Sequence, residues 1–155
     1  MRILISACLL GVCCRYDGQS KACPAALELL KDHELIPVCP EQLGGLPTPR
    51  PPAEIQGDRV INREGADVTA QYQKGAEEAA RLYQLFHCDC AVLKARSPSS
   101  GCGEVYDGSF SGTLVPGNGI TVQALKRLGV SAMTEETISA VRMPSKRESN
   151  PSSLP

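Results

Sequence analysis

Cysteine is the residue type in this sequence with the widest range of possible chemistry. The chain of 155 residues holds eight cysteines, and Cys8, Cys39 and Cys102 each follow a predicted core strand. In a small secreted domain so many cysteines would indicate disulfides, whereas in a reducing compartment they favour metal binding or catalysis. Because the sequence has no recognisable secretory leader or membrane span, we expect a cytoplasmic protein whose thiols bind a metal or do chemistry.

The spacing of the cysteines leaves the kind of metal open. The chain contains no C-x2-C pair, so the ligands would come from separated loops. Zinc bound by three cysteines and a water occurs in nucleobase deaminases, but the H-x-E and P-C-x-x-C motifs of a zinc-dependent nucleobase hydrolase of that type are missing from the sequence. A 4Fe-4S cluster held by three cysteines would leave one iron open as a Lewis acid. A non-enzymatic module that binds metal or senses oxidant through cysteine is the third possibility.

Strand and helix patterns alternate along the chain. Short apolar runs predict core strands at residues 2–7, 34–39, 90–95 and 130–133, with a further short strand at 59–62. Helix signals predict a helix at 24–33, a helix at 119–128, and a last helix from the cap Thr134 to about Val141. A long helix capped by Asp67 is predicted to present one apolar face, formed by Val68, Tyr72, Ala76, Ala79, Tyr83 and Phe86.

This alternation predicts an α/β fold, a single-domain Rossmann-like sheet that is mostly parallel and flanked by helices. We expect the domain to span residues 1–142 and residues 143–155 to be a disordered tail. In such folds ligands bind beyond the carboxyl ends of the strands. The segments that follow the three best strands read CLLGVCCRYDG, CPEQLGGLPTPRPP and RSPSSGCGEVYDG. We therefore expect Cys8, Cys39 and Cys102 to meet at one edge of the sheet.

The charge balance favours a small molecule as the partner. The formal net charge is −1, with 16 Lys and Arg residues against 17 Asp and Glu residues. A protein that binds extended nucleic acid or an anionic membrane usually carries a basic surface, which this balance does not indicate. The sequence carries no signal for an oligomeric state.

Several long motifs resemble those of a known family. The segments SACLLG with RYDG, PVCPEQLGGLPTPRPP, GADVT, and LKARSPSSG with YDGSFSG are similar to the thiouracil desulfidase (TudS) family, formerly a bacterial domain of unknown function, over residues 1–133. The resemblance implies an iron-sulfur enzyme that removes sulfur from a thiolated uracil compound and releases sulfide without net redox change. It also implies three cysteine ligands for a 4Fe-4S cluster, which we assign to Cys8, Cys39 and Cys102. Family members often read S-P-S-C-G where this chain reads SPSSGC, and Cys14 is the alternative third ligand.

The same resemblance implies roles for residues around the ligands. Glu41, two residues after Cys39, is the candidate general base, and Ser97 and Ser100 are candidates to hold the attacking water or the heterocycle. The substrate would be 2-thiouracil, 4-thiouracil or 4-thiouridine monophosphate. For a nucleotide, a phosphate site is expected from basic side chains and two backbone amides, namely Arg15, Arg50, Lys94, Arg96, Gly44 and Gly45.

Other polar and sulfur-containing residues are interpreted as structural. Asp17 and Asp107 each lie in a YDG segment, which predicts Asp-Gly turns. The remaining cysteines are interpreted as small buried apolar side chains, namely Cys13, Cys14, Cys23, Cys88 and Cys90.

Overall fold

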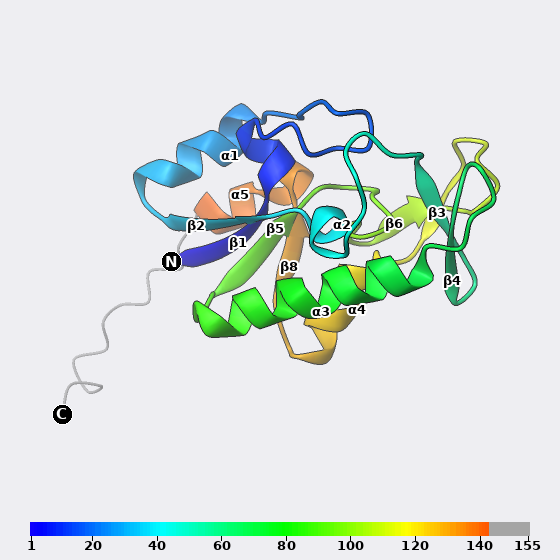
Figure 1. Ribbon diagram of the computed structural model, residues 1–155. Helices are drawn as coiled ribbons and strands as arrows, with labels where there is room; N and C mark the ends of the chain where they lie inside the picture. Colours follow the sequence, from blue (N-terminus) through cyan, green and yellow to red (C-terminus); the bar gives the residue numbers. More distant parts are fainter. Residues whose placement is uncertain (143–155) are drawn as a thin grey trace.

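Four apolar segments form the central sheet of the computed structural model, which describes residues 1–142 (Figure 1). All neighbouring strands are parallel, in the order β2-β1-β5-β8. The strands are β1 (Arg2–Ser6), β2 (Glu34–Val38), β5 (Cys90–Leu93) and β8 (Ala132–Thr134). The four predicted core strands are thus confirmed, although β8 begins two residues later than expected. The amide of Val130 still bonds to the carbonyl of Leu125 in the turn that follows a helix.

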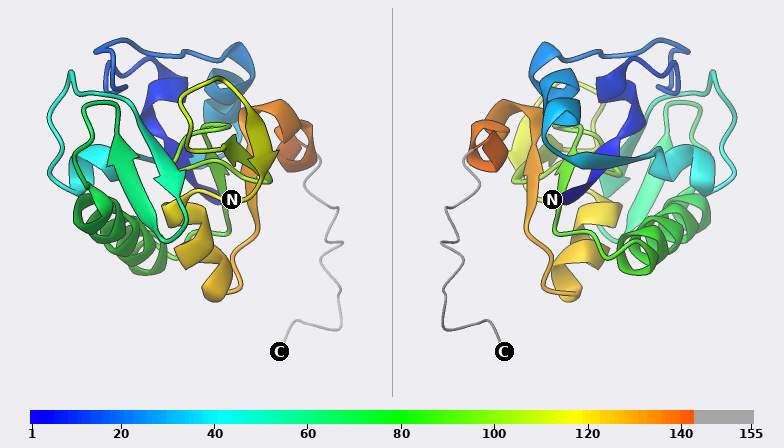
Figure 2. Two further views of the ribbon diagram at one scale, coloured as in Figure 1. Left: turned by 90° about the vertical axis from the view of Figure 1, so that its right-hand side faces the viewer. Right: turned by 90° about the vertical axis from the view of Figure 1, so that its left-hand side faces the viewer.

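Helices cover both faces of this sheet, as Figures 1 and 2 show. Successive strand residues point to opposite faces. Ile3 and Ile5 therefore pack on one face with Ala26 of α1 (Pro24–Glu28) and Leu29 of the 3-10 turn η2 (Leu29–Lys31). The same face is covered by Val141 of α5 (Ser139–Arg142) and by Ile138, which lies between α5 and the 3-10 turn η3 (Glu135–Thr137). Leu4 packs on the other face with α3 (Thr69–Leu85) and α4 (Ile120–Arg127), through Ala79, Val122 and Leu125. The predicted α/β fold with a mostly parallel, helix-flanked sheet is confirmed.

The long helix α3 follows its predicted pattern except at its two ends. Its N-cap is Val68, one residue after the predicted cap Asp67. The Asp67 carboxylate instead accepts a hydrogen bond from the amide of Thr69 at 2.9 Å, in a turn that leads into the helix. Val68, Tyr72, Ala76 and Ala79 are buried. Phe86, in contrast, is 42% exposed, because α3 ends at Leu85 and the chain turns away from the core there.

The two shorter predicted helices of the first face are each split. Residues 24–31 form α1 followed by the 3-10 turn η2, and the last segment forms η3 before α5. Thr134 caps η3 as expected, since its hydroxyl accepts a hydrogen bond from the amide of Glu136 at 3.2 Å. The helix predicted at 119–128 is α4, which begins after the cap Gly119.

Two β-hairpins lie beyond the carboxyl ends of the sheet strands, in front of the sheet in the left view of Figure 2. One pairs β3 (Ala53–Gln56) with β4 (Arg59–Asn62), and the other pairs β6 (Glu104–Tyr106) with β7 (Leu114–Pro116). Only β4 was expected as a strand. The other three strands are only three or four residues long, too short for a periodic pattern to stand out from the surrounding loops.

The chain outside these elements concerns two predictions. The expected disordered tail, residues 143–155, lies outside the described residues. Within residues 1–142, no helix combines the length and apolar character that a membrane crossing requires.

Candidate active site

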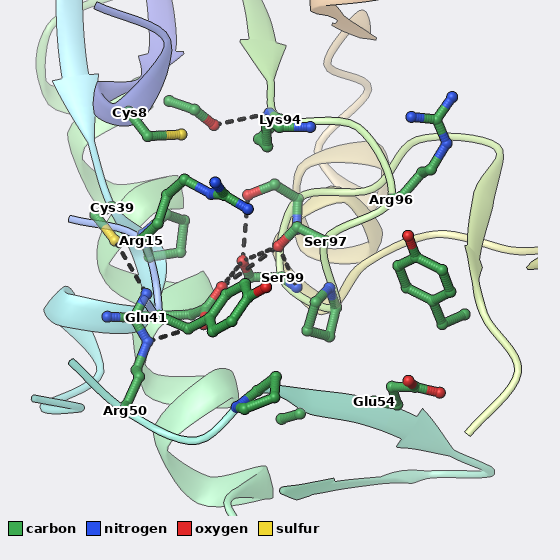
Figure 3. Close-up of a pocket in the computed structure, with 18 of the residues that line it drawn as sticks. Cys8, Arg15, Cys39, Glu41, Arg50, Glu54, Lys94, Arg96, Ser97 and Ser99 are labelled. Carbon is green, nitrogen blue, oxygen red and sulfur yellow. Dashed lines mark hydrogen bonds and ion pairs between the residues drawn. The ribbon is translucent and has the colours of Figure 1, made fainter. Parts of the chain in front are cut away.

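A pocket of about 640 Å³ lies at the carboxyl ends of β1, β2 and β5. Its walls come from the segments that follow these three strands and, on the opposite side, from the two hairpins (Figure 3). β1 and β5 are neighbours, but the chain after β1 leads to α1 on one face of the sheet and the chain after β5 leads to α4 on the other face. The loops that leave the two strands therefore diverge and open a crevice, the usual ligand site of an open parallel sheet.

Three thiols meet in this pocket. Cys8 lies on η1 (Ala7–Leu10) directly after β1, Cys14 lies on the following loop, and Cys39 precedes the short helix α2 (Pro40–Leu43) after β2. Cys39 donates from its thiol to the carbonyl of Cys14 at 3.6 Å, and the guanidinium of Arg50 donates to that same carbonyl at 3.0 Å. Arg50 Nη2 also lies 4.0 Å from the Cys39 sulfur. Two separate strand ends are therefore tied together around one group of sulfur atoms.

The nearness of the three thiols separates their pKa values. The neighbouring Cys14 thiol lowers the pKa of Cys8 despite its burial. The Cys14 thiol, together with burial, raises the pKa of Cys39. Cys8 is therefore the thiol of this group that loses its proton most readily, and a thiolate is the form that binds iron or zinc.

Cys102, the expected third ligand, does not join this group. Its sulfur donates to the carbonyl of Ala132 at 3.5 Å, and its side chain packs on the sheet face covered by α3 and α4. Cys102 does not line the pocket, whereas Cys14 is 2% exposed and contacts both other thiols. In SPSSGC the cysteine lies two residues later than in S-P-S-C-G, and its side chain faces the core. Cys14 therefore replaces Cys102 in the candidate ligand set.

The other cysteines lie outside the sulfur group. Cys88 and Cys90 are buried, as expected, and burial raises the pKa of Cys90 to about 11. Cys23 is half-buried. Cys13 is exposed, which corrects its interpretation as a buried apolar side chain, because its neighbour Cys14 takes the inward position on the loop.

The three thiols supply the donor set of a 4Fe-4S cluster. Cysteine thiolates hold such clusters, and three of them leave one iron without a protein ligand. Cys8, Cys14 and Cys39 are buried or half-buried and face one pocket from the segments that follow β1 and β2. Among residues 1–142, no group of three or more His, Cys, Asp or Glu side chains is arranged to hold a single metal ion.

Glu41 lies at the centre of a hydrogen-bond network on the pocket wall (Figure 3). It stands in the first turn of α2, and its side chain is 14% exposed. Arg50 Nε donates to the Glu41 Oε1 atom at 3.1 Å, and the Tyr72 hydroxyl donates to the same oxygen at 2.9 Å. The Oε2 atom accepts from Ser99 Oγ at 2.9 Å and from Ser97 Oγ at 3.4 Å. Both oxygens are thus held in place, and Oε2 is the one beside the serine hydroxyls.

Two members of this network escaped the sequence-based prediction. Tyr72 was predicted only as a core residue of α3, yet its hydroxyl reaches Glu41, and burial followed by the charge of Glu41 raises its pKa. Ser99 contacts Glu41 directly, whereas the predicted Ser100 is buried behind it, 3.3 Å from the Ser99 hydroxyl. The SPSS run was a signal for hydroxyl groups at this point, but it could not indicate which of them faces the carboxylate.

The predicted basic residues line the pocket, and each has an acidic partner. Lys94 Nζ lies 2.8 Å from Glu135, Arg15 lies 3.4 Å from Asp17, and Arg96 pairs with Glu136. Arg50 is committed to Glu41. Two further basic residues that the sequence did not single out, Lys21 and Arg63, also line the pocket, which makes six basic side chains against the two carboxylates Glu41 and Glu54.

The predicted glycine amides are not available to a ligand. Gly44 donates its amide to the carbonyl of Pro40, and Gly45 donates to the carbonyl of Gln42, so both close the end of α2. Neither glycine lines the pocket. A Cβ atom on Gly44 would lie 1.9 Å from the carbonyl oxygen of Gln71, so this glycine permits the close packing of α2 on α3.

The Asp-Gly segments form the turns that were expected. Asp17 accepts a hydrogen bond from the amide of Gln19 at 3.0 Å, and Asp107 accepts one from the amide of Ser109 at 2.9 Å. The hydrogen bonds from the Ser109 hydroxyl and amide lower the pKa of Asp107. Both side chains are thus used locally.

The fold and the site together define a class: an α/β protein whose pocket, at the carboxyl edge of a parallel sheet, combines three cysteines with a carboxylate held by serine, tyrosine and arginine. Comparison with known proteins gives the family. The sequence profile of 2-thiouracil desulfurase matches residues 3–137. The chain therefore belongs to the 2-thiouracil desulfurase family, and the predicted resemblance and the prediction of an enzyme are confirmed.

Two relatives extend this result. A solved structure of a 4Fe-4S-dependent thiouracil desulfidase, TudS, is 42% identical to this chain, with a TM-score of 0.87, and the match covers 92% of this chain and 95% of that one. The uncharacterized protein YbbK of Bacillus subtilis strain 168 is 35% identical over 149 residues, which cover 90% of this chain and 99% of YbbK.

Proposed function

We propose that the protein removes sulfur from a thiolated uracil compound by hydrolysis, using a 4Fe-4S cluster held by Cys8, Cys14 and Cys39. The observation that carries this proposal is the meeting of these three thiols with Glu41 in one pocket. The family match and the 4Fe-4S-dependent relative support the reaction and the cofactor.

The balanced reaction replaces the thiocarbonyl sulfur by oxygen from water and releases one hydrogen sulfide, so no electron donor or acceptor is needed. When bound, the cluster supplies a Lewis-acidic iron without a cysteine ligand, which suits a sulfur atom of the substrate. Glu41 accepts the proton of the attacking water at its Oε2 atom. Arg50 and Tyr72 donate to the other oxygen and hold the carboxylate in place. The hydroxyl of Ser97 lies 3.4 Å from Glu41, a weak contact that it can exchange for a hydrogen bond to the attacking water or to the pyrimidine ring of the substrate.

Replacing Tyr72 with Phe tests whether the Tyr72 hydroxyl holds the Glu41 carboxylate in place. The change removes one hydrogen bond to a carboxylate that keeps its bond to Arg50. We expect the turnover per cluster to fall by about 3- to 10-fold with KM unchanged, because the ring still fills its place in the core while the carboxylate gains freedom. Tyr83→Phe, on the same helix but away from the pocket, is the control. An unchanged kcat in Tyr72→Phe would remove this residue from the supporting network.

Replacing Arg15 with Gln tests whether the substrate carries a phosphate. The six basic side chains that line the pocket outnumber the two carboxylates that line it. Arg15 is paired with Asp17 at 3.4 Å, but its side chain is 20% exposed and can still reach a ligand. If 4-thiouridine monophosphate is the substrate, we expect KM for the nucleotide to rise by about 10-fold or more, with KM for 4-thiouracil unchanged. Arg59→Gln, on β4 outside the pocket, is the matched control. An equal change for both substrates would contradict a phosphate contact.

The proposed function itself is tested by anaerobic reconstitution with iron and sulfide, followed by assays with 2-thiouracil, 4-thiouracil and 4-thiouridine monophosphate. We expect uracil or its nucleotide and sulfide in equal amounts, in proportion to bound iron. A zinc-loaded protein with full turnover, or an iron-loaded protein with none toward all three compounds, would refute the proposal.

A further inference from the structure

One wall of the pocket is formed by the loop that joins β6 to β7, residues 107–113. Phe110 and Gly112 of this loop line the pocket, together with Tyr106 at the end of β6. These residues lie on the side opposite the sheet strands, and the proposed chemistry uses none of them. The loop therefore raises the question of what fixes its position.

A buried carboxylate anchors this loop. Glu54 on β3 is 8% exposed, and its Oε1 atom accepts hydrogen bonds from the amides of Gly108 at 3.0 Å and Phe110 at 3.1 Å. Gln56, two residues further on the same strand, donates its side-chain amide to the carbonyl of Gly108 at 2.8 Å. In Figure 3, Glu54 lies across the pocket from Glu41. The β3–β4 hairpin thus holds the loop of the β6–β7 hairpin through the Glu54 carboxylate. Glu54 has no ion-pair partner among the salt bridges of residues 1–142.

Phe110 adopts a conformation that needs such support. Its φ angle is +56°, in the left-handed region that a bulky side chain rarely occupies. A residue of this kind persists only where its surroundings hold it, and such residues cluster at ligand sites. The Glu54 carboxylate holds the Phe110 amide, and the guanidinium of Arg63 lies 5.7 Å from the centre of the Phe110 ring. The aromatic ring is thereby fixed from both the backbone and the side chain.

We propose that Glu54 is a positioning residue, which fixes Phe110 as the wall against which the flat ring of the substrate packs. This inference rests on the proposed function, since it takes a planar pyrimidine as the ligand. Aromatic side chains bind such rings by stacking or edge contacts, and the gain is realised on binding, before any chemistry. Glu54 therefore acts on substrate affinity through Phe110 and has no part in activating water.

The test compares Glu54→Ala, Glu54→Gln and Phe110→Ala with the wild-type holoenzyme. Glutamine keeps a side-chain oxygen that accepts the two amide hydrogen bonds, whereas alanine keeps none. We expect Glu54→Ala and Phe110→Ala each to raise KM by about 5- to 30-fold with kcat per cluster within about twofold of wild type, and Glu54→Gln to restore KM. Glu64→Ala, an exposed glutamate just beyond the same hairpin, is the matched control. Hydrogen exchange at the Gly108 and Phe110 amides should accelerate in Glu54→Ala only.

The outcomes separate this inference from the proposed function. A wild-type KM in Glu54→Ala, or equal losses of kcat in Glu54→Ala and Glu54→Gln, would overturn the positioning role. If Glu54→Ala fails to fold, Phe110→Ala decides, and a wild-type KM there would overturn the role of the ring. A wild-type enzyme that turns over none of the three thiolated compounds would refute the proposed function and the packing of the substrate ring with it, while amide exchange would still report the anchoring of the loop.

Discussion

Glu41→Gln is expected to lower the turnover per cluster by about 10²- to 10⁴-fold, the usual loss when a general base is removed. The variant keeps the size of the side chain. Its amide oxygen can still accept from Arg50 and Tyr72, and its amide nitrogen can donate to Ser99, so the hydrogen bonds that hold the pocket wall are retained. Cluster content should therefore stay at the wild-type level while catalysis is lost.

The measurement is the initial rate divided by bound iron. Glu77→Gln, an exposed glutamate on α3, is the control and should match wild type. A purely structural Glu41 would give a different pattern, with less bound iron or a lower melting temperature but a normal rate per cluster. That pattern would transfer the activation of water to the hydroxyls of Ser97 or Ser99.

Cys14→Ser is expected to abolish binding of the cluster, and Cys102→Ser to leave it intact. A hydroxyl is a far poorer ligand for iron at neutral pH than a thiolate, so the loss of one of three ligands should remove most bound iron. Cys8→Ser and Cys39→Ser should behave like Cys14→Ser. The amount of iron and acid-labile sulfide per chain, with the visible absorbance of the reconstituted protein, measures the effect.

The pair of variants decides between the two candidates for the third ligand. Cys102 packs beside Ala132 on the far face of the sheet, so Cys102→Ser changes the core slightly and should cost at most some stability. Full cluster content in Cys14→Ser together with its loss in Cys102→Ser would reverse our assignment. It would also mean that the loop after Ser100 rearranges to reach the pocket.

Features that depend on local patterns were predictable from the sequence. Apolar runs such as RILIS and CAVL form the sheet, and the rule that ligand sites follow parallel strands brought Cys8, Cys39 and the Ser97 segment to one edge. The hairpins were harder to predict from the sequence, because a strand such as β7 (Leu114–Pro116) is short and all its residues are exposed. Without two faces of different polarity, such strands leave no periodic signal.

Features that depend on contacts between distant segments could not be predicted. The helical period correctly put Tyr72 on the buried face of α3, but it holds no information on a hydroxyl that meets Glu41, 31 residues away in the sequence. The same limit applies to Gly44, whose role is the contact of α2 with α3 rather than the binding of an anion. For Cys14 and Cys102, the turn geometry of two loops decides which thiol faces the pocket, and neither turn follows from residue types alone.

Hydrolysis in water labelled with oxygen-18 tests the central claim most directly. The reconstituted enzyme is incubated anaerobically with 4-thiouracil in the labelled water, without an electron donor, and the uracil formed is analysed by mass spectrometry alongside the sulfide released. We predict one labelled oxygen in each uracil and one sulfide per uracil, with unlabelled uracil incubated under the same conditions as the control for exchange. Uracil without the label, or a cluster-loaded enzyme that forms no sulfide, would contradict the hydrolytic desulfuration assigned to this pocket.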